Sequence, residues 1–109
     1  MTNTVKVLGQ SAPLATTLTV LYTVPALTRT TSSSIVICNR SVVDATFRVS
    51  VAVSGAADAT KQYLYYDQAV EANSTFIATI GITLSLTDEV RVYASAADLS
   101  FNLFGVEVV

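Results

Sequence analysis

Apolar and polar residues alternate with a period of two in several short segments of this chain, and turn-forming residues separate those segments. The clearest example is the segment 45–54, which Gly55 follows. A period of two places alternate side chains on one face of an extended strand, as in an antiparallel strand with one buried face. We therefore predict a strand over 45–54. Its core face should consist of Phe47, Val49, Val51 and Val53.

Other segments repeat this pattern or are rich in Val, Ile, Thr, Tyr and Phe, which favour strands. Turn signals separate them about every 8–12 residues, a spacing typical of sandwiches and barrels. Thr28–Ser34 is polar and predicts a loop, and 57–62 predicts a short helical turn. For residues 1–12 an extended N-terminal arm and an edge strand both stay open. Further strands are predicted over 18–24, 34–39, 63–66, 75–83, 89–95 and 99–108.

These segments predict an all-β fold, an antiparallel two-sheet β-sandwich of about seven to eight strands. The strand order is left open between jelly-roll and immunoglobulin-like. At 109 residues the chain has the length of one domain, so residues 1–109 are predicted to form a single β-sandwich.

Charge is scarce in this sequence. Charged residues make up 13%, about half of the roughly 25% found in ordinary soluble domains. A small domain with so little charge must expose uncharged surface, which favours a permanent partner or a homo-oligomer. The six basic residues are scattered singly, so a nucleic-acid partner is not expected. No apolar run approaches the ~20 residues of a membrane-spanning helix, so no membrane association is expected.

The residue types of this chain give little support for a catalytic role. The chain has no histidine, and its one cysteine, Cys38, lies in an apolar segment that predicts a buried side chain. Most carboxylates fall in predicted turns and lack the alternating spacing of a calcium loop. We therefore expect no enzymatic activity, no catalytic residues, no cofactor and no metal.

Two pairs of residues are candidates for a protein interface. Tyr63 and Tyr65 are predicted to share one face of a strand, where exposed tyrosines suit a protein interface, a sugar-binding platform or a plain sheet covering. Val5 and Val7 lie in the predicted arm or edge strand, which could pair only in an assembly.

Several segments together are similar to small β-rich structural proteins of tailed bacteriophages. The resemblance rests on 11–24, 36–40 (VICNR), 47–50 (FRVS), 61–67 (KQYLYYD) and 88–94 (DEVRVYA). It implies a virion protein made in the host bacterial cytoplasm. Foremost is a capsid decoration (cement) protein, often a homotrimer, that binds the major capsid protein or another virion structural protein.

Two alternatives to capsid decoration stay open. One is a phage tail or baseplate protein with a structural or receptor-binding role. The other is a stand-alone carbohydrate-binding β-sandwich module, against which the absence of tryptophan counts, because sugar platforms favour large aromatic rings.

Overall fold

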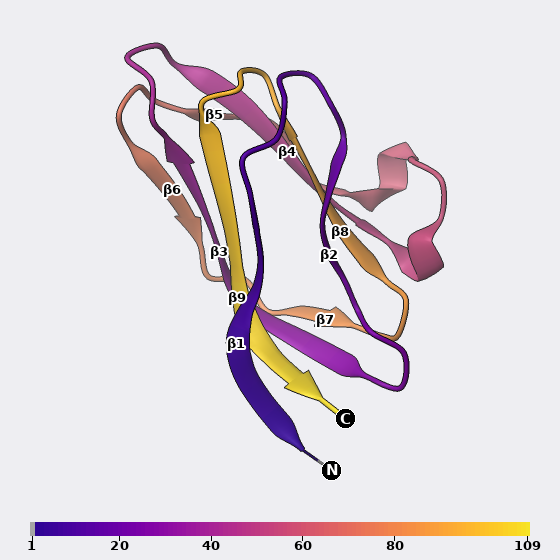
Figure 1. The fold of residues 1–109 in the computed structure, drawn as a ribbon. Coiled ribbons are helices and arrows are strands. Elements are labelled where there is room, and N and C mark those ends of the chain that lie inside the picture. The colour runs from indigo at the N-terminus through magenta and orange to yellow at the C-terminus, as the bar shows by residue number, and fades with distance from the viewer. Residues whose placement is uncertain (1) are drawn as a thin grey trace.

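The computed structural model describes residues 2–109, which form two antiparallel sheets packed face to face (Figure 1). The first sheet contains β1 (Asn3–Ser11), β9 (Leu99–Val108), β3 (Arg29–Asn39), β6 (Thr75–Ala78) and β7 (Ile82–Leu84). The second sheet contains β2 (Thr19–Thr23), β8 (Glu89–Ala94), β4 (Ala45–Ala52) and β5 (Tyr63–Val70). Two short 3-10 turns, η1 (Val53–Gly55) and η2 (Thr60–Gln62), separate β4 from β5. The two-sheet sandwich predicted from the sequence is confirmed.

The strands pair in nested order. β4 pairs with β5, β3 with β6 and β7, β2 with β8, and β1 with β9. The chain therefore runs as one long hairpin that turns back between β4 and β5 and folds over into two layers. This is the strand order of a jelly roll, one of the two orders that the sequence left open. It places the edge strand β1 beside β9, which lies between β1 and β3.

The predicted loop Thr28–Ser34 was wrong, because β3 begins at Arg29 and continues to Asn39. The polar residues of this half-strand can lie in a sheet because their hydroxyls have partners. Thr30 is buried with its hydroxyl 2.8 Å from the Tyr22 hydroxyl, and buried Ser32 donates to the Phe104 carbonyl oxygen at 3.1 Å. The polar run therefore forms the first half of β3 through contacts with residues that are distant in sequence.

The single strand predicted over 75–83 is divided into β6 and β7, so residues 2–109 hold nine strands instead of seven or eight. β6 pairs with Ile35–Cys38 and β7 pairs with Thr30–Ser32 of the same neighbour, β3. Between those two stretches the register of β3 against β9 shifts at Ser33. The interruption of the edge strand therefore coincides with an irregularity in β3.

Phe47 occupies the centre of the core and joins the two sheets. Its ring centroid lies 5.9 Å from that of Tyr65 in the same sheet, and 5.2 Å and 6.1 Å from those of Phe76 and Phe101 in the opposite sheet. Phe47 and Phe101 are fully buried. Tilted and edge-on ring pairs at such separations add to the stabilisation from burial alone.

The predicted core face of 45–54 is correct at one end only. Phe47 and Val49 are fully buried and Val51 packs against the margin of the core, but Val53 is 68% exposed. The strand ends at Ala52, and Ser54 has a left-handed backbone (φ 54°) in the following turn, so the alternation stops before Val53.

We expect Phe47→Ala to lower the free energy of unfolding by about 3–5 kcal/mol, because it removes the ring that contacts both sheets and leaves a cavity. Urea denaturation followed by circular dichroism measures this change. Val53→Ala is the matched control and should change stability by less than about 0.5 kcal/mol, because its side chain is exposed. Equal losses for the two variants would contradict this description of the core.

Candidate protein interface

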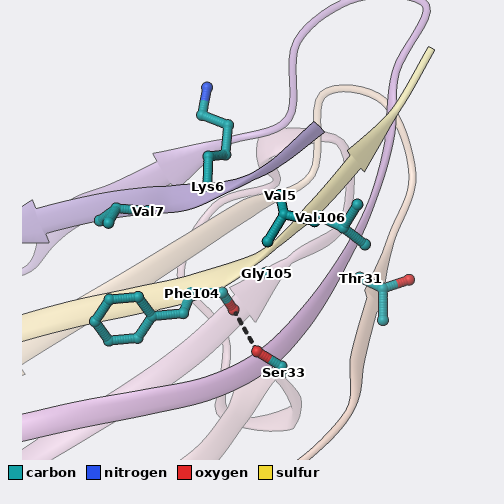
Figure 2. A pocket seen from close by; sticks show the side chains of 8 residues that line it. All are labelled: Val5, Lys6, Val7, Thr31, Ser33, Phe104, Gly105 and Val106. Atoms are coloured by element: carbon teal, nitrogen blue, oxygen red, sulfur yellow. Dashed lines mark hydrogen bonds between the residues drawn. The ribbon is translucent and has the colours of Figure 1, made fainter. Parts of the chain in front are cut away.

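Val5 and Val7 lie on the edge strand β1, which pairs with β9 along its length. The prediction for residues 1–12 left an arm and an edge strand open; residue 1 lies outside the described residues, and Asn3–Ser11 forms an edge strand. Val5 is paired with Val106, and Val7 with Phe104. Together these side chains line an open groove of about 370 Å³ that Thr31 and Ser33 continue onto β3 (Figure 2). The Lys6 side chain extends away from the Phe104 ring, so the lining is mainly apolar (Figure 2).

The groove belongs to a larger surface, the outer face of the first sheet, which we call the uncharged face. Alternation along the paired strands defines its members within residues 2–109. They are Asn3, Val5, Val7, Gln10, Thr31, Ser33, Ser34, Val36, Cys38, Thr75, Ile77, Thr83, Ser100, Asn102, Phe104, Val106 and Val108.

Charged side chains lie only at the two ends of this face within the described residues. Arg29 lies at the start of β3, opposite Val108. Arg40 follows the end of β3 and donates to the Ser100 hydroxyl at 2.8 Å and to the Ala97 carbonyl at 3.1 Å. The middle of the face carries valine, isoleucine, phenylalanine, serine and threonine. Depletion of charge is the compositional feature of the buried centre of protein interfaces.

Exposed apolar side chains cover part of the uncharged face. Val5 is 86% exposed, Ile77 62% and Val7 45%, while Val36, Phe104 and Val106 are half-buried. Cys38 is half-buried on this face and was wrongly predicted to be a core residue. Its neighbours on the strand, Ile37 and Asn39, point into the core instead. The face thus combines little charge with accessible apolar surface.

Sequence reasoning named only Val5 and Val7 among these residues. The signal for Phe104 and Val106 was present, because in β9 the inward residues Leu99, Phe101 and Leu103 alternate with positions that are polar at first and apolar after Asn102. A strand that is apolar on both faces at one end indicates a second covered surface. The sequence could not assign Ile77 to this face, because its position depends on the register of β6 against β3.

The outer face of the second sheet is different, since it is charged and aromatic. Arg48 lies with its guanidinium carbon 4.1 Å from the ring centroid of Tyr66 and 4.3 Å from that of Tyr93. Its Nε donates to the Asp67 carboxylate at 2.7 Å, and this hydrogen bond raises the pKa of Arg48. Glu89 and Arg91 form a further ion pair on the same face at 3.0 Å.

The prediction that Tyr63 and Tyr65 share a face was wrong. Tyr65 packs into the core against Phe47 and Phe76, whereas Tyr63 makes an edge-on contact with the exposed ring of Tyr66 at 5.1 Å. The cause is a bulge: Val49 pairs with Tyr65 but its neighbour Ser50 pairs with Tyr63, so Leu64 is an extra residue. An extra residue reverses the alternation from that point on.

Tyr63 is therefore not part of a pair of free tyrosine rings. Its hydroxyl donates to the Asp58 carboxylate at 2.9 Å, and burial together with this hydrogen bond raises its pKa. Tyr66 contacts Arg48 on its ring face. These rings are engaged within the chain, unlike the side chains of the uncharged face, so we take the uncharged face as the candidate interface.

A polar cluster fixes the end of the sandwich beneath the groove. The Tyr22 hydroxyl on β2 donates to the Glu107 carboxylate on β9 at 2.5 Å, and Lys6 on β1 lies 3.3 Å from the same carboxylate. Because Tyr22 donates to Glu107, the Thr30 hydroxyl donates to the Tyr22 oxygen. The cluster ties three strands of the first sheet to β2 and so holds β1 in place. Burial, with the hydrogen bond to Glu107, raises the pKa of Tyr22 to about 12.

No protein-family model matches this chain, and no curated protein or solved structure is similar to it at a significant level. Within residues 2–109 no helix is long and apolar enough to cross a membrane. The same residues contain no group of three or more histidine, cysteine, aspartate or glutamate side chains placed to hold a metal ion.

We expect the Tyr22 cluster to make stability fall at alkaline pH. In the unfolded chain tyrosine loses its proton near pH 10, but in the folded protein Tyr22 keeps it to about pH 12. The stabilisation is therefore complete below pH 10 and is lost as the pH rises from 10 to 12, by up to about 3 kcal/mol. Chemical denaturation across this pH range measures the loss.

Tyr22→Phe is the control, since it lacks the titrating hydroxyl but keeps the buried ring. Its stability should fall less steeply with pH than that of the wild type, because it lacks the hydroxyl whose pKa is raised. Parallel pH profiles would rule out a contribution from Tyr22.

Proposed function

We propose that this protein is a non-catalytic structural protein that binds another protein through the uncharged face. In this proposal it is a bacteriophage virion protein, foremost a capsid decoration (cement) protein that binds and stabilises the shell. The partner is the major capsid protein or another virion structural protein, and the protein resides in the virion after synthesis in the host bacterial cytoplasm.

The observation that carries the binding role is the unequal distribution of charge between the two outer faces. The outer face of one sheet carries Arg48, Asp67, Glu89 and Arg91 in local ion pairs, with Asp67 exposed and the other three half-buried. The other exposes Val5, Val7 and Ile77 among serine and threonine, and the described residues place charge only at its ends. An interface over the second face would remove apolar surface from water, which favours association. It would desolvate few charged side chains, so the desolvation penalty would be small.

Support for the virion setting comes from a different source. The resemblance of 36–40, 47–50, 61–67 and 88–94 to small phage structural proteins implies a decoration or tail-associated role. The jelly-roll order agrees with this by analogy, since viral capsid domains use it, but lectins use it as well. The resemblance also implies a trimer, whereas the geometry of β1 favours a two-fold pair, as argued below.

The alternative roles differ in which surface they use. A tail or baseplate protein would use the uncharged face in the same way but on another partner, so its location in the virion distinguishes it. A carbohydrate-binding module would use exposed aromatic rings. The ring faces of Tyr66 and Tyr93 are stacked on Arg48, which favours protein binding over sugar binding for this chain.

We expect Ile77→Lys to weaken binding to capsids by at least about tenfold while the fold stays intact. The side chain is 62% exposed, so the monomer tolerates the charge, but an interface would bury the lysine without a partner. The measurement is co-sedimentation with capsids that lack this protein, together with a cryo-EM map of the decorated particle.

The matched control is Val20→Lys, which adds the same charge to an exposed valine on the outer face of the second sheet. It should bind capsids as the wild type does. If Val20→Lys abolished binding and Ile77→Lys did not, the binding face would be the other sheet. Absence of wild-type binding to any virion structure would refute the virion role.

A further inference from the structure

The first half of β1 has a free edge. Residues 3–7 pair with β9 on one side, and no strand formed by residues 2–109 lies on the other side, where β1 extends past the body of the sandwich (Figure 1). All five of these residues are exposed. β1 approaches β2 only farther along, where Gly9 packs so closely against the Leu21 carbonyl that a Cβ would lie 2.3 Å from its oxygen. The open edge is therefore limited to residues 3–7.

The hydrogen-bond pattern shows which backbone groups are free on this edge. Thr2 and Val109 exchange both N–H to carbonyl hydrogen bonds, at 3.2 Å and 3.0 Å. In an antiparallel ladder such pairs recur at every second residue, so Thr4 and Lys6 also bond to β9. The N–H and carbonyl groups of Asn3, Val5 and Val7 consequently point to the free edge.

We propose that β1 pairs with β1 of a second copy of this chain, antiparallel and about a two-fold axis at Val5. In this register Val5 exchanges hydrogen bonds with Val5 of the partner subunit, and Asn3 exchanges them with Val7 of the partner subunit. Every free group of Asn3, Val5 and Val7 then has a partner. The segment is self-complementary because Asn3 and Val7, whose backbone groups face the free edge, lie two positions before and two positions after Val5.

The side chains fit the same register. Lys6 lies opposite Thr4 of the partner subunit, so the only charged residues of the two segments do not oppose each other. Lys6 is also already paired with Glu107. With the axis perpendicular to the sheet, Val5 and Val7 of both copies lie on one side, next to Phe104 and Val106. The two uncharged faces thereby become one continuous surface.

The open edge carries only one of the usual devices against such pairing, the charge of Lys6, which is already paired with Glu107 of the neighbouring strand. Natural edges carry proline, inward-pointing charges or a bulge that prevents another strand from adding. Residues 3–7 contain no proline, and the register shift of β1 lies beyond them, between Val7 and Gly9. An exposed edge with three β-branched residues, whose one charge is paired within its own sheet, fits a strand that pairs in the native assembly.

This inference deepens the proposed function, because the paired copy supplies a doubled uncharged face to the capsid, but it is tested without a capsid. Sedimentation velocity of the full chain over a concentration series should show a monomer–dimer equilibrium. Val5→Pro should shift it to monomer, since proline removes an N–H that points to the free edge and is not bonded to β9. Val5→Thr keeps that N–H and should remain dimeric.

A cysteine pair tests the register independently of any effect of proline on folding. In a Cys38→Ser background, Val5→Cys should form a disulfide-linked dimer on mild oxidation, because paired residues lie about 5.5 Å apart between Cα atoms. Val7→Cys in the same background is the matched control. Its partner copy lies four residues away along the strand, roughly 13 Å, and should cross-link at least about tenfold more slowly.

A wild-type chain that stays monomeric, or a trimer that Val5→Pro leaves unchanged, overturns the β1 pair. Equal cross-linking through positions 5 and 7 overturns it as well. A monomer that still binds capsids through Ile77 refutes the pairing and leaves the proposed function standing. A dimer with the predicted cross-link that binds no virion structure supports the pairing and refutes the proposed function.

Discussion

The contact of Phe47 with Phe101 across the sandwich determines how the rest of the chain is displayed. Each ring is fully buried, and they lie on facing strands of opposite sheets. Because side chains alternate along a strand, pointing these two rings inward turns their neighbours outward. Arg48 is thereby exposed on one outer face, and Asn102 and then Phe104 on the other. The two outer faces and their different chemistry follow from the way this core is packed.

The jelly-roll pairing then concentrates charge unevenly. β9 lies inside the first sheet, and its one acidic residue, Glu107, points inward to Tyr22 and Lys6 and not onto the outer face. The charges of β4, β5 and β8 pair with one another on the second sheet. With only 13% charged residues in the chain, this grouping leaves one whole face nearly uncharged. Such a face is stable in an assembly and a liability in a monomer.

Bulges accompany two of the differences between expectation and structure. The extra residue at Leu64 moved Tyr63 to the outer face while Tyr65 stayed in the core, and the irregularity at Ser33 coincides with the division of β6 from β7. A bulge does not change the composition of a segment, so hydrophobic patterning could not place it. The polar start of β3 was missed for a related reason: Thr30 and Ser32 are satisfied by Tyr22 and by the Phe104 carbonyl, which lie far away in the sequence.

The sequence by itself determined the all-β class, the two-sheet sandwich, most strand positions and most of the inward face of β4, because strand propensity and a period of two are local properties. It also placed Val5 and Val7 on an edge strand or arm. Only the tertiary structure decided the jelly-roll order, the partners of the polar residues and the membership of the uncharged face. Those depend on which strands lie side by side and in what register, and register is set by contacts between residues as distant as Val5 and Val106.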